Sequence, residues 1–335
     1  MLSYEASAAF DPALQTHRAD HFPLAWFSLY QQPMSLSWAD IASNIPVPQV
    51  DWQPNVSPKT YTQKISQIHD HIAKGETYQV NYSYRQQAEY PHSAGALFQT
   101  LSHGNNGRYG AWLDTGRFAV CSASPELFFT FDPSTRTLAS KPMKGTIHRG
   151  KTMAEDLENS HWLQNSEKNR AENLMIVDMI RNDMSRVAEL GSVRVPDLFK
   201  LEKYSTLWTM TSKVECRVQQ DKTVTDIFEA LFPCASITGA PKVSTMQIIR
   251  QLESTPRGIY CGTIGMIEPD GRATFNVAIR TAVLDKEQKK ATYGVGGGIV
   301  WDSDADTEWV ETQTKSKILQ GVPLSAGVPS PVPFS

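Results

Sequence analysis

Two neighbouring segments near the end of the sequence carry residues that suit ligand binding. Gly296, Gly297 and Gly298 interrupt a β-branched run, and glycines inside a strand indicate a bulge or a ligand that lies on bare backbone N–H groups. Glu308, Glu311 and Lys315 follow at i, i+3 and i+7, a spacing that places them on one face of a helix. A solvated helix with internal ion pairs would show the same spacing. The adjacent glycines favour a binding site, and an anion would suit their donors.

Two other residues could act chemically on a bound molecule. Glu126 follows Pro125 at the start of an apolar strand, and Lys144 stands between Met143 and Gly145. A lysine before a glycine is commonly only a charge in a loop. A lysine that is removed from water loses its proton more readily, however, and its free amine is a nucleophile. The sequence alone leaves both interpretations of Lys144 open.

Glu172 is a third candidate because it lies on an apolar helix. Residues 170–183 are apolar on so many sides that this helix is expected to be buried. A charge on a buried helix needs a partner. Glu172 therefore either has a function or forms a structural ion pair with Arg170 or Arg181.

Two further positions could hold an anion. Arg280 is flanked by small residues on one face of a predicted strand, which leaves room for a carboxylate to reach its guanidinium group. The turn around Ala240 leads into a predicted helix, with Ser236 or Thr238 as its expected cap. The N–H groups at such a helix start can bind an anion.

The composition narrows the class of protein. The 335 residues include 32 Lys and Arg against 35 Asp and Glu, so no strong field indicates binding to nucleic acid or to an anionic membrane. Four scattered cysteines without a CxxC pair suggest buried thiols in a reducing compartment. The N-terminus has no signal-peptide pattern and no apolar run is long enough to cross a membrane. We therefore expect a cytoplasmic protein.

The elements that must position these residues alternate between strands and helices, which predicts an α+β fold. Apolar spacing predicts helices over 61–74, 153–185, 226–231 and 243–252. Alternating patterns bounded by turn residues predict strands over 75–85, 108–114, 117–131, 137–150, 192–204 and 207–218, and a hairpin over 258–267 and 273–284.

Seven motifs, in the same order, are similar to those of the chorismate-utilising enzyme family. They are SPELFF (124–129), KPMKGT (141–146), RAENLMIVDMIRND (170–183), SITGAPK (236–242), RGIYCGTIG (257–265), IRTA (279–282) and GGGIV through ETQTK (296–315). The resemblance covers about residues 75–320. It implies a sandwich of two packed antiparallel sheets flanked by helices. It also implies a partial N-terminal segment over 1–60 and a chorismate-binding catalytic domain over 61–320. Residues 321–335 are rich in Pro, Ser and Gly, a composition that predicts a disordered tail or linker stub.

Lys144 selects a branch of that family. Lysine in the PMKGT motif marks the aminodeoxychorismate synthases, whereas anthranilate synthases carry alanine there and histidine at the place of Thr209. The resemblance implies formation of 4-amino-4-deoxychorismate from chorismate and ammonia, in the synthesis of 4-aminobenzoate and folate. Lys144 would attack the ring, and Glu126 would be the general acid and base.

The resemblance also implies a magnesium ion and a set of substrate contacts. Glu172 and Glu311 correspond to direct ligands of Mg²⁺ and Glu308 to its outer shell, while Asn169 stands where the family usually has a further acid. The positions that match those holding the two carboxylates of chorismate are Ala240, Tyr260, Arg280, Gly297, Gly298 and Lys315.

Partners and alternatives complete the prediction. Nothing in the sequence resembles a glutamine amidotransferase, so a separate subunit would have to supply ammonia from glutamine. The alternatives are an anthranilate synthase component I, or a truncated chorismate-binding remnant without turnover. The second arises because a substantial segment that the family carries ahead of SYEAS is not seen in this sequence.

Overall fold

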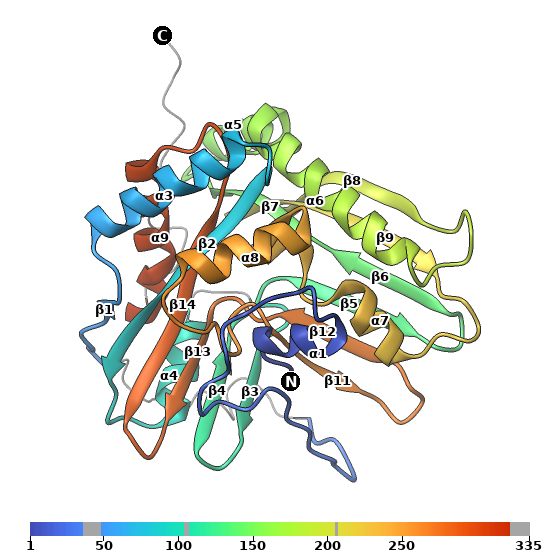
Figure 1. Ribbon diagram of the computed structural model, residues 1–335, viewed down its shortest axis with the longest axis horizontal. Helices are drawn as coiled ribbons and strands as arrows, with labels where there is room; N and C mark the ends of the chain where they lie inside the picture. The colour runs from blue at the N-terminus through green and yellow to red at the C-terminus, as the bar shows by residue number, and fades with distance from the viewer. Residues whose placement is uncertain (36–47, 104–106, 205–206, 322–335) are drawn as a thin grey trace.

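The computed structural model describes residues 1–35, 48–103, 107–204 and 207–321. These residues form two antiparallel sheets flanked by helices (Figure 1). The first sheet has the strand order β1-β2-β14-β13-β4-β3, and β10 also pairs with β2. Its strands are β1 (Gln53–Pro54), β2 (Gln79–Glu89), β3 (Ala111–Asp114), β4 (Phe118–Ser122), β10 (Gly239–Ala240), β13 (Thr281–Asp285) and β14 (Lys290–Ile299).

The second sheet has the order β11-β12-β5-β6-β9-β7, and β8 also pairs with β9. Its strands are β5 (Leu127–Asp132), β6 (Thr137–Lys141), β7 (Met143–His148), β8 (Arg194–Lys203), β9 (Leu207–Arg217), β11 (Thr263–Ile267) and β12 (Ala273–Val277). The predicted α+β sandwich of two antiparallel sheets with flanking helices is confirmed.

The helices divide between the two sheets. Helices α3 and α9 pack together and α4 packs on β4, whereas α6 packs on β7, β9 and α7. Helix α8 packs on β2 and β10, and Figure 1 shows it in orange in front of β2. The helices are α1 (Ser7–Phe10), α3 (Pro58–Ala73), α4 (Ala94–Ser102), α5 (Met153–Asn165), α6 (Glu167–Ser185), α7 (Val224–Leu231), α8 (Lys242–Leu252) and α9 (Ala305–Ser316), with short 3₁₀ turns η1 (Tyr4–Ala6), η2 (Ala235–Ile237) and η3 (Lys317–Gln320).

Strand β2 shows how the sequence pattern divides the first sheet into two faces. Val80, Tyr82 and Tyr84 are buried in the apolar core beneath α3, α4 and α9. The alternate positions point to the opposite face of the strand. They are all polar and all buried: Gln79, Asn81, Ser83 and Arg85. Gln79, on this polar face, lies against Gly298 of β14, and Lys144 lies against the same glycine.

Several predicted boundaries were wrong, each for a local reason. The predicted helix over 153–185 is two helices, because Ser166 caps α6 and ends α5. The predicted strand over 137–150 is split at Pro142 into β6 and β7, which both pair with β9. Proline cannot donate to a strand ladder, which explains the break. The predicted tail lies outside the described residues except for Gly321.

The largest departure from the prediction is that two expected strands each change sheets. The segment 117–131 forms β4 in the first sheet and β5 in the second, and the segment 273–284 forms β12 in the second and β13 in the first. The two passages run side by side. Ala123 N–H donates to the Arg280 carbonyl at 3.0 Å, and Val277 N–H donates to the Glu126 carbonyl at 3.1 Å. We call residues 123–126 and 278–280 the paired crossover.

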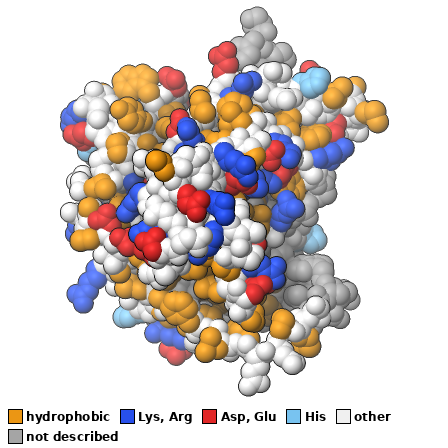
Figure 2. Space-filling view, turned by 90° about the vertical axis from the view of Figure 1, so that its right-hand side faces the viewer, with side chains coloured by type: hydrophobic (Ala, Val, Ile, Leu, Met, Phe, Trp, Pro, Cys, Tyr) orange, Lys and Arg blue, Asp and Glu red, His pale blue; other side chains and the backbone are white. Residues whose placement is uncertain are grey.

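The described surface and thiols agree with the composition. No helix in the described part of the chain is both long and apolar enough to span a bilayer. On the face in Figure 2, basic and acidic side chains are interspersed rather than separated by sign. All four cysteines are buried and free, and burial raises the pKa of the Cys121 thiol to about 12.

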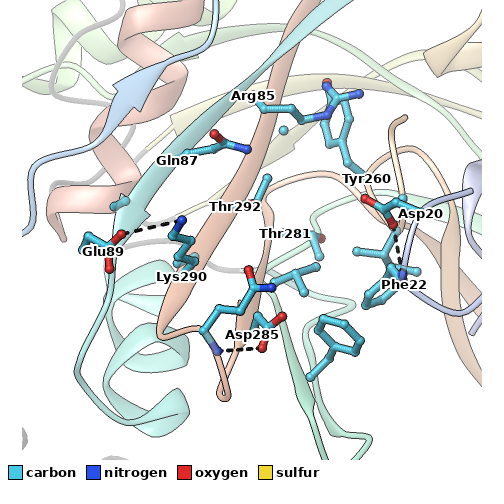
Figure 3. A pocket seen from close by; sticks show the side chains of 18 of the residues that line it. Asp20, Phe22, Arg85, Gln87, Glu89, Tyr260, Thr281, Asp285, Lys290 and Thr292 are labelled. Carbon is cyan, nitrogen blue, oxygen red and sulfur yellow. Dashed lines mark hydrogen bonds and ion pairs between the residues drawn. The ribbon is translucent and has the colours of Figure 1, made fainter. Parts of the chain in front are cut away.

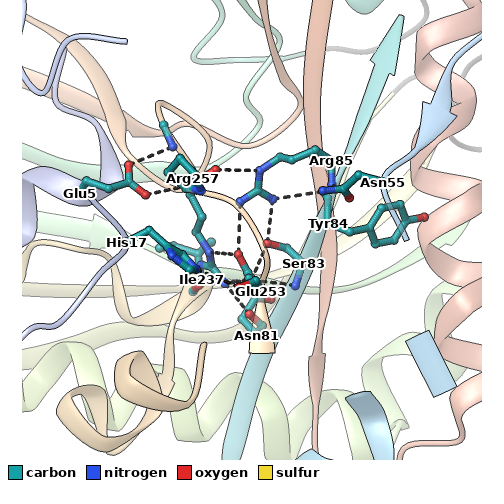
Figure 4. Close-up of polar contacts among 12 residues, drawn as sticks. Glu5, His17, Asn55, Asn81, Ser83, Tyr84, Arg85, Ile237, Glu253 and Arg257 are labelled. Atoms are coloured by element: carbon teal, nitrogen blue, oxygen red, sulfur yellow. Dashed lines mark hydrogen bonds and ion pairs between the residues drawn. The ribbon is translucent and has the colours of Figure 1, made fainter. Parts of the chain in front are cut away.

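A buried ion cluster joins β2 to the segment that follows α8 (Figure 4). The Glu253 carboxylate accepts from Arg257 Nη2 at 2.6 Å and from Arg85 Nη2 at 3.2 Å. Ser83 adds its N–H at 2.9 Å and its hydroxyl at 2.8 Å. Burial alone would raise the pKa of Glu253, but the two guanidinium groups outweigh it and lower that pKa. The cluster is fully hydrogen-bonded, as buried charges require.

The N-terminal residues are anchored to the same cluster. Both oxygens of the Glu5 carboxylate accept backbone N–H groups, from Arg257 at 2.7 Å and from Gly258 at 2.9 Å. The Arg257 guanidinium also lies over the Tyr4 ring, 4.6 Å from its centroid. The first residues of the chain therefore belong to the core of the fold.

We expect Glu253→Gln to lower the free energy of unfolding by about 3–5 kcal/mol, because it leaves Arg85 and Arg257 buried without their counter-charge. Chemical denaturation followed by circular dichroism measures this loss. Glu268→Gln is the matched control, since it breaks the exposed ion pair with Arg272 and should cost under about 1 kcal/mol. Equal midpoints for the two variants would contradict a stabilising role for the cluster.

Candidate active site

Glu126 lies in the paired crossover, where the chain leaves the first sheet. The Ser124 hydroxyl donates to the Val277 carbonyl at 2.6 Å and thereby fixes the corner. The Glu126 side chain is only 4% exposed, and its Oε1 has no hydrogen-bond partner in the described structure. A buried carboxyl with an open acceptor is available to a ligand.

Burial raises the pKa of Glu126 to about 7. A hydrogen bond from Ser236, the charges of Lys144 and Arg280, and the Met143 N–H all act in the opposite direction and limit the rise. A carboxyl with a pKa near neutrality exchanges its proton readily at physiological pH. Glu126 therefore has the properties of a general acid and base.

Lys144 lies on β7, half-buried between the two sheets. Its ammonium is 3.5 Å from the point that a side chain on Gly298 would occupy. Its charge lowers the pKa of Glu126 and also the pKa of Glu311. Lys144 is thus brought together with the glycine run and with two of the predicted acids, and it is not a charge in an exposed loop.

Gly145, next to Lys144, has a left-handed backbone with φ of 81°, a conformation that glycine adopts without strain. Thr209 donates its hydroxyl to the Gly145 carbonyl at 3.0 Å. The Asn169 side chain lies 3.0 Å from the point where a β-carbon on Gly145 would sit. Thr209 and Asn169, the two positions singled out in the sequence as departures from a family pattern, therefore both lie against Gly145.

The glycine run of β14 serves both faces of the first sheet. Gly298 faces Lys144, whereas Gly297 faces α9, with Glu308 Oε2 at 3.2 Å and Lys315 Nζ at 4.0 Å from its missing β-carbon. Lys315 Nζ also donates to the Gly296 carbonyl at 2.9 Å. Bare backbone at these positions leaves room that any side chain would fill.

The helix face predicted for Glu308, Glu311 and Lys315 is present on α9, which Asp304 caps by accepting the Thr307 N–H at 2.9 Å. Lys315 Nζ lies 2.7 Å from Glu311 and lowers the pKa of that carboxyl. Glu308 is 5% exposed, and both burial and the charge of Glu311 raise its pKa. The interpretation as an exposed helix with ion pairs holds for Glu311 but not for Glu308.

Glu172 lies half-buried on α6. The two arginines considered as its partners contact other groups: Arg170 stacks over Phe199, and Arg181 pairs with Asp178. Among the described residues, no three side chains of His, Cys, Asp or Glu are close enough together to hold a metal ion. Of the three predicted metal ligands, Glu308 lies against Gly297, and Glu311 is close enough to raise the pKa of Glu308.

Arg280 lies in the paired crossover beside Glu126. The prediction that it continues the strand face of Ala278 and Ala282 was wrong, because the strand ends at Val277 and Arg280 has a positive φ of 51°. Its guanidinium interacts with Glu126 and Tyr293, and burial lowers its pKa. A positive φ is rare for a residue with a side chain and is tolerated where the surroundings fix it.

Ala240 and Tyr260 contact different strands of the first sheet. Ala240 pairs with Gln79 of β2, and α8 begins with Pro241 as its N-cap, so the predicted caps Ser236 and Thr238 were wrong. The Tyr260 ring lies against the backbone of Gly294, under the Arg85 guanidinium. Gly294 is four residues from Gly298, about 13 Å along the strand.

Tyr260 also lines a separate open hollow of about 860 Å³ over the polar face of β2, β13 and β14 (Figure 3). The charges that line it are mostly paired, such as Arg117 with Asp285 at 2.6 Å and Lys290 with Glu89 at 3.9 Å. The hollow contains neither Glu126 nor Lys144. The two residues expected to react therefore lie outside this hollow.

Gln79 is a site residue that sequence reasoning missed. Its side chain is 1% exposed, and neither atom of its amide group has a hydrogen-bond partner in the described structure. It lies directly against Gly298, as Lys144 does. The available signal was the run of polar residues at alternate positions of an otherwise apolar strand, which marks a polar buried face.

The chorismate binding enzyme family matches residues 42–321 of this sequence. The chain therefore belongs to that family. An aminodeoxychorismate synthase of Streptomyces griseus is 41% identical over 76% of this chain and 35% of its own length. An aminodeoxychorismate synthase component 1 of Escherichia coli is 38% identical over 79% of this chain and 58% of its own length.

Among solved structures, anthranilate synthase component I from Streptococcus pneumoniae aligns with a TM-score of 0.81 at 24% identity, over 96% of this chain and 79% of that one. At this identity the likeness shows the fold alone. The chain spans between about a third and three fifths of the length of the two curated relatives.

The pKa of Glu126 predicts how stability depends on pH. The pKa rises from 4.5 to about 7 on folding, so this carboxyl stabilises the fold fully below its unfolded value. We expect the contribution of Glu126 to the free energy of unfolding to fall by about 3 kcal/mol as pH rises through the folded pKa. The Glu126→Gln variant should lack this pH-dependent part of the free energy of unfolding, whereas Glu268→Gln should keep it. Denaturant midpoints from about pH 5 to about pH 8 measure the difference; parallel profiles for the wild type and Glu126→Gln would contradict the assignment.

Proposed function

We propose that this chain forms 4-amino-4-deoxychorismate from chorismate and ammonia, as the chorismate-using component of an aminodeoxychorismate synthase. Membership of the chorismate binding family and the names of both curated relatives support this proposal. The observation that carries it is the position of the Lys144 ammonium, beside Gly298 and close enough to Glu126 and Glu311 to lower the pKa of each.

In this proposal Lys144 is the nucleophile. Its amine attacks C2 of the chorismate ring, the double bond shifts, and the hydroxyl on C4 leaves. Ammonia then adds at C4, the double bond shifts back, and the lysine is expelled. Covalent catalysis of this kind replaces one difficult displacement by two easier steps.

Glu126 gives its proton to the departing hydroxyl and later takes one from the incoming ammonia. A pKa of about 7 suits a group that must do both near neutral pH. Gln79, with both amide atoms unpartnered, is placed to hydrogen-bond a ligand that lies on Gly298.

The two carboxylates of chorismate require positive charge and backbone donors. We assign them to Arg280, Lys315, Ala240, Tyr260 and the bare backbone at Gly297 and Gly298. Arg280 meets the requirement for a bidentate partner, and its buried position strengthens the attraction.

Magnesium fits the acids of α9. Glu308 is buried beside Glu311, which raises its pKa, and two like charges in one place favour a hard cation with oxygen ligands. We assign direct contacts to Glu311 and Glu172 and outer contacts to Glu308. Bound Mg²⁺ would neutralise a carboxylate of the substrate.

Ammonia from glutamine would come from a separate amidotransferase subunit. The name component 1 of the E. coli relative implies a second component for that protein. With this partner, the product would feed synthesis of 4-aminobenzoate and folate in the cytoplasm.

Two alternatives remain distinct from this proposal. An anthranilate synthase would need no nucleophile at position 144, and its branch carries histidine in place of Thr209. A chorismate-binding remnant would bind the substrate without turnover. The decisive experiment is product analysis with chorismate, Mg²⁺ and an ammonium salt. Aminodeoxychorismate supports the proposal; anthranilate with pyruvate supports the first alternative; binding without product supports the second.

Lys144→Ala should lower kcat by about a thousandfold, which corresponds to roughly 4 kcal/mol for loss of a covalent route, while chorismate still binds. Mass spectrometry without ammonia should find chorismate-derived mass on the peptide that contains Lys144. Lys144→Arg is the control for simple attraction of carboxylates, because it keeps the charge but not the nucleophile. If arginine restores turnover, Lys144 acts only through its charge.

Glu311→Gln should weaken Mg²⁺ binding by about 10- to 100-fold while the protein stays folded. Titration calorimetry with Mg²⁺ in the presence of chorismate measures the change directly. Glu287→Gln is a matched control, because Glu287 is exposed on the turn between β13 and β14. Unchanged Mg²⁺ affinity in Glu311→Gln would remove this residue from the metal site.

A further inference from the structure

Lys242 is a buried cation that no step of the proposed reaction uses. It is the first residue of α8, and its side chain is 15% exposed. Its ammonium donates to Asp183 Oδ2 at 2.7 Å and to the Leu231 carbonyl at 3.2 Å. Asp183 lies in the last turn of α6, and Leu231 is the last residue of α7. The C-terminal ends of helices favour a cation, so both contacts are in favourable positions.

Lys242 and Leu231 are also the two residues that bound the loop 232–241. Lys242 Nζ therefore ties the end of this loop back to its beginning. The loop is buried along most of its length. The Arg257 guanidinium and the Asn81 side chain both donate to the Ile237 carbonyl, at 2.9 and 3.0 Å.

Two contacts of the loop reach the candidate active site. Ser236 lies close enough to Glu126 to lower the pKa of that carboxyl, and Gly239–Ala240 pairs with Gln79 and Val80 of β2. A displacement of the loop would therefore move a polar neighbour of Glu126 and the strand pairing of Gln79 together.

We propose that Lys242 is a positioning residue for the reaction: its ammonium acts as a clasp that holds the ends of loop 232–241 together and keeps Ser236 on Glu126. This inference rests on the proposed function for its kinetic consequences. The clasp itself, as a restraint on the loop, can be measured without turnover.

A positioning role affects the proton affinity of Glu126, which a purely structural ion pair would leave unchanged. The groups that face Glu126 are Lys144 from β7, Arg280 from the paired crossover, and Cys234 and Ser236 from the loop. Ser236 lowers the pKa of Glu126. A loosened loop moves Ser236 away from Glu126, so the pKa of Glu126 rises and the part of the pH–rate profile that depends on Glu126 moves to higher pH.

The test uses the double variant Lys242→Met with Asp183→Asn, which removes the ion pair without leaving a buried charge unpaired. Arg117→Met with Asp285→Asn is the matched control, because it removes a partly buried pair at the far end of β13. For the Lys242 variant we expect faster amide exchange in the peptide over 232–241. We also expect kcat to fall by about a hundredfold with little change in KM. The part of the pH–rate profile that depends on Glu126 should move to higher pH. The control should keep wild-type values for all three.

Unchanged amide exchange over 232–241 in a folded double variant would overturn the clasp, whatever turnover does. An equal loss of kcat in the control would also overturn it, because any lost ion pair would then have the same effect. If the wild-type chain makes no aminodeoxychorismate, the proposed function fails on its own, and amide exchange in the Lys242 variant still decides whether the clasp exists.

Discussion

The two sheets depend on one pair of hydrogen-bonded passages between them. Strands β4 and β13 pair in the first sheet and β5 and β12 pair in the second, so the crossover is a bend in a continuous two-stranded ribbon. At the bend, neither strand ladder is complete, and side-chain and backbone contacts such as Ser124 to Val277 replace it. Glu126 and Arg280 both lie there. The interruption that joins the sheets therefore also places a buried carboxyl with a pKa near neutrality beside a buried cation.

The glycine run of β14 extends this arrangement to both faces of one strand. Because Gly297 and Gly298 have no side chains, α9 reaches the backbone from one face, while Lys144 and Gln79 reach it from the other. In the proposed reaction, a substrate on this backbone would meet the acids of α9 from one face and Lys144 from the other. The strand thus keeps Lys144 and Glu308 on opposite faces of the sheet, with only glycine backbone between them.

The sequence predicted the types of element and named many of the residues that the structure brings together, but it did not predict the boundaries at which the strands change sheets. Helix α9 was predictable, because the spacing of Glu308, Glu311 and Lys315 is local. The motifs around Glu126 and Lys144 indicated their importance, and the family resemblance indicated their roles. The change of sheet at Pro125 was not predictable, because a strand pattern gives the alternation of side chains but not the partner strand.

The residues that were missed depend on contacts distant in sequence. Gln79 resembles any polar residue in a strand until Gly298 and Ala240 are placed against it. From the sequence, Lys242 could be placed only at the start of a helix, because its partner Asp183 is 59 positions away. In contrast, Ser166 was a local signal for a helix cap that the apolar periodicity of its neighbours obscured.

The attachment of the N-terminus by Glu5 has a consequence for biosynthesis. Its two acceptor bonds go to residues 252 and 253 positions later in the chain, and closing so long a loop is slow compared with forming local helices. During synthesis, Glu5 must therefore wait until Gly258 has left the ribosome before its carboxylate can form these bonds. Until then the Glu5 carboxylate and the Tyr4 ring, which contact Arg257 in the folded state, stay in water.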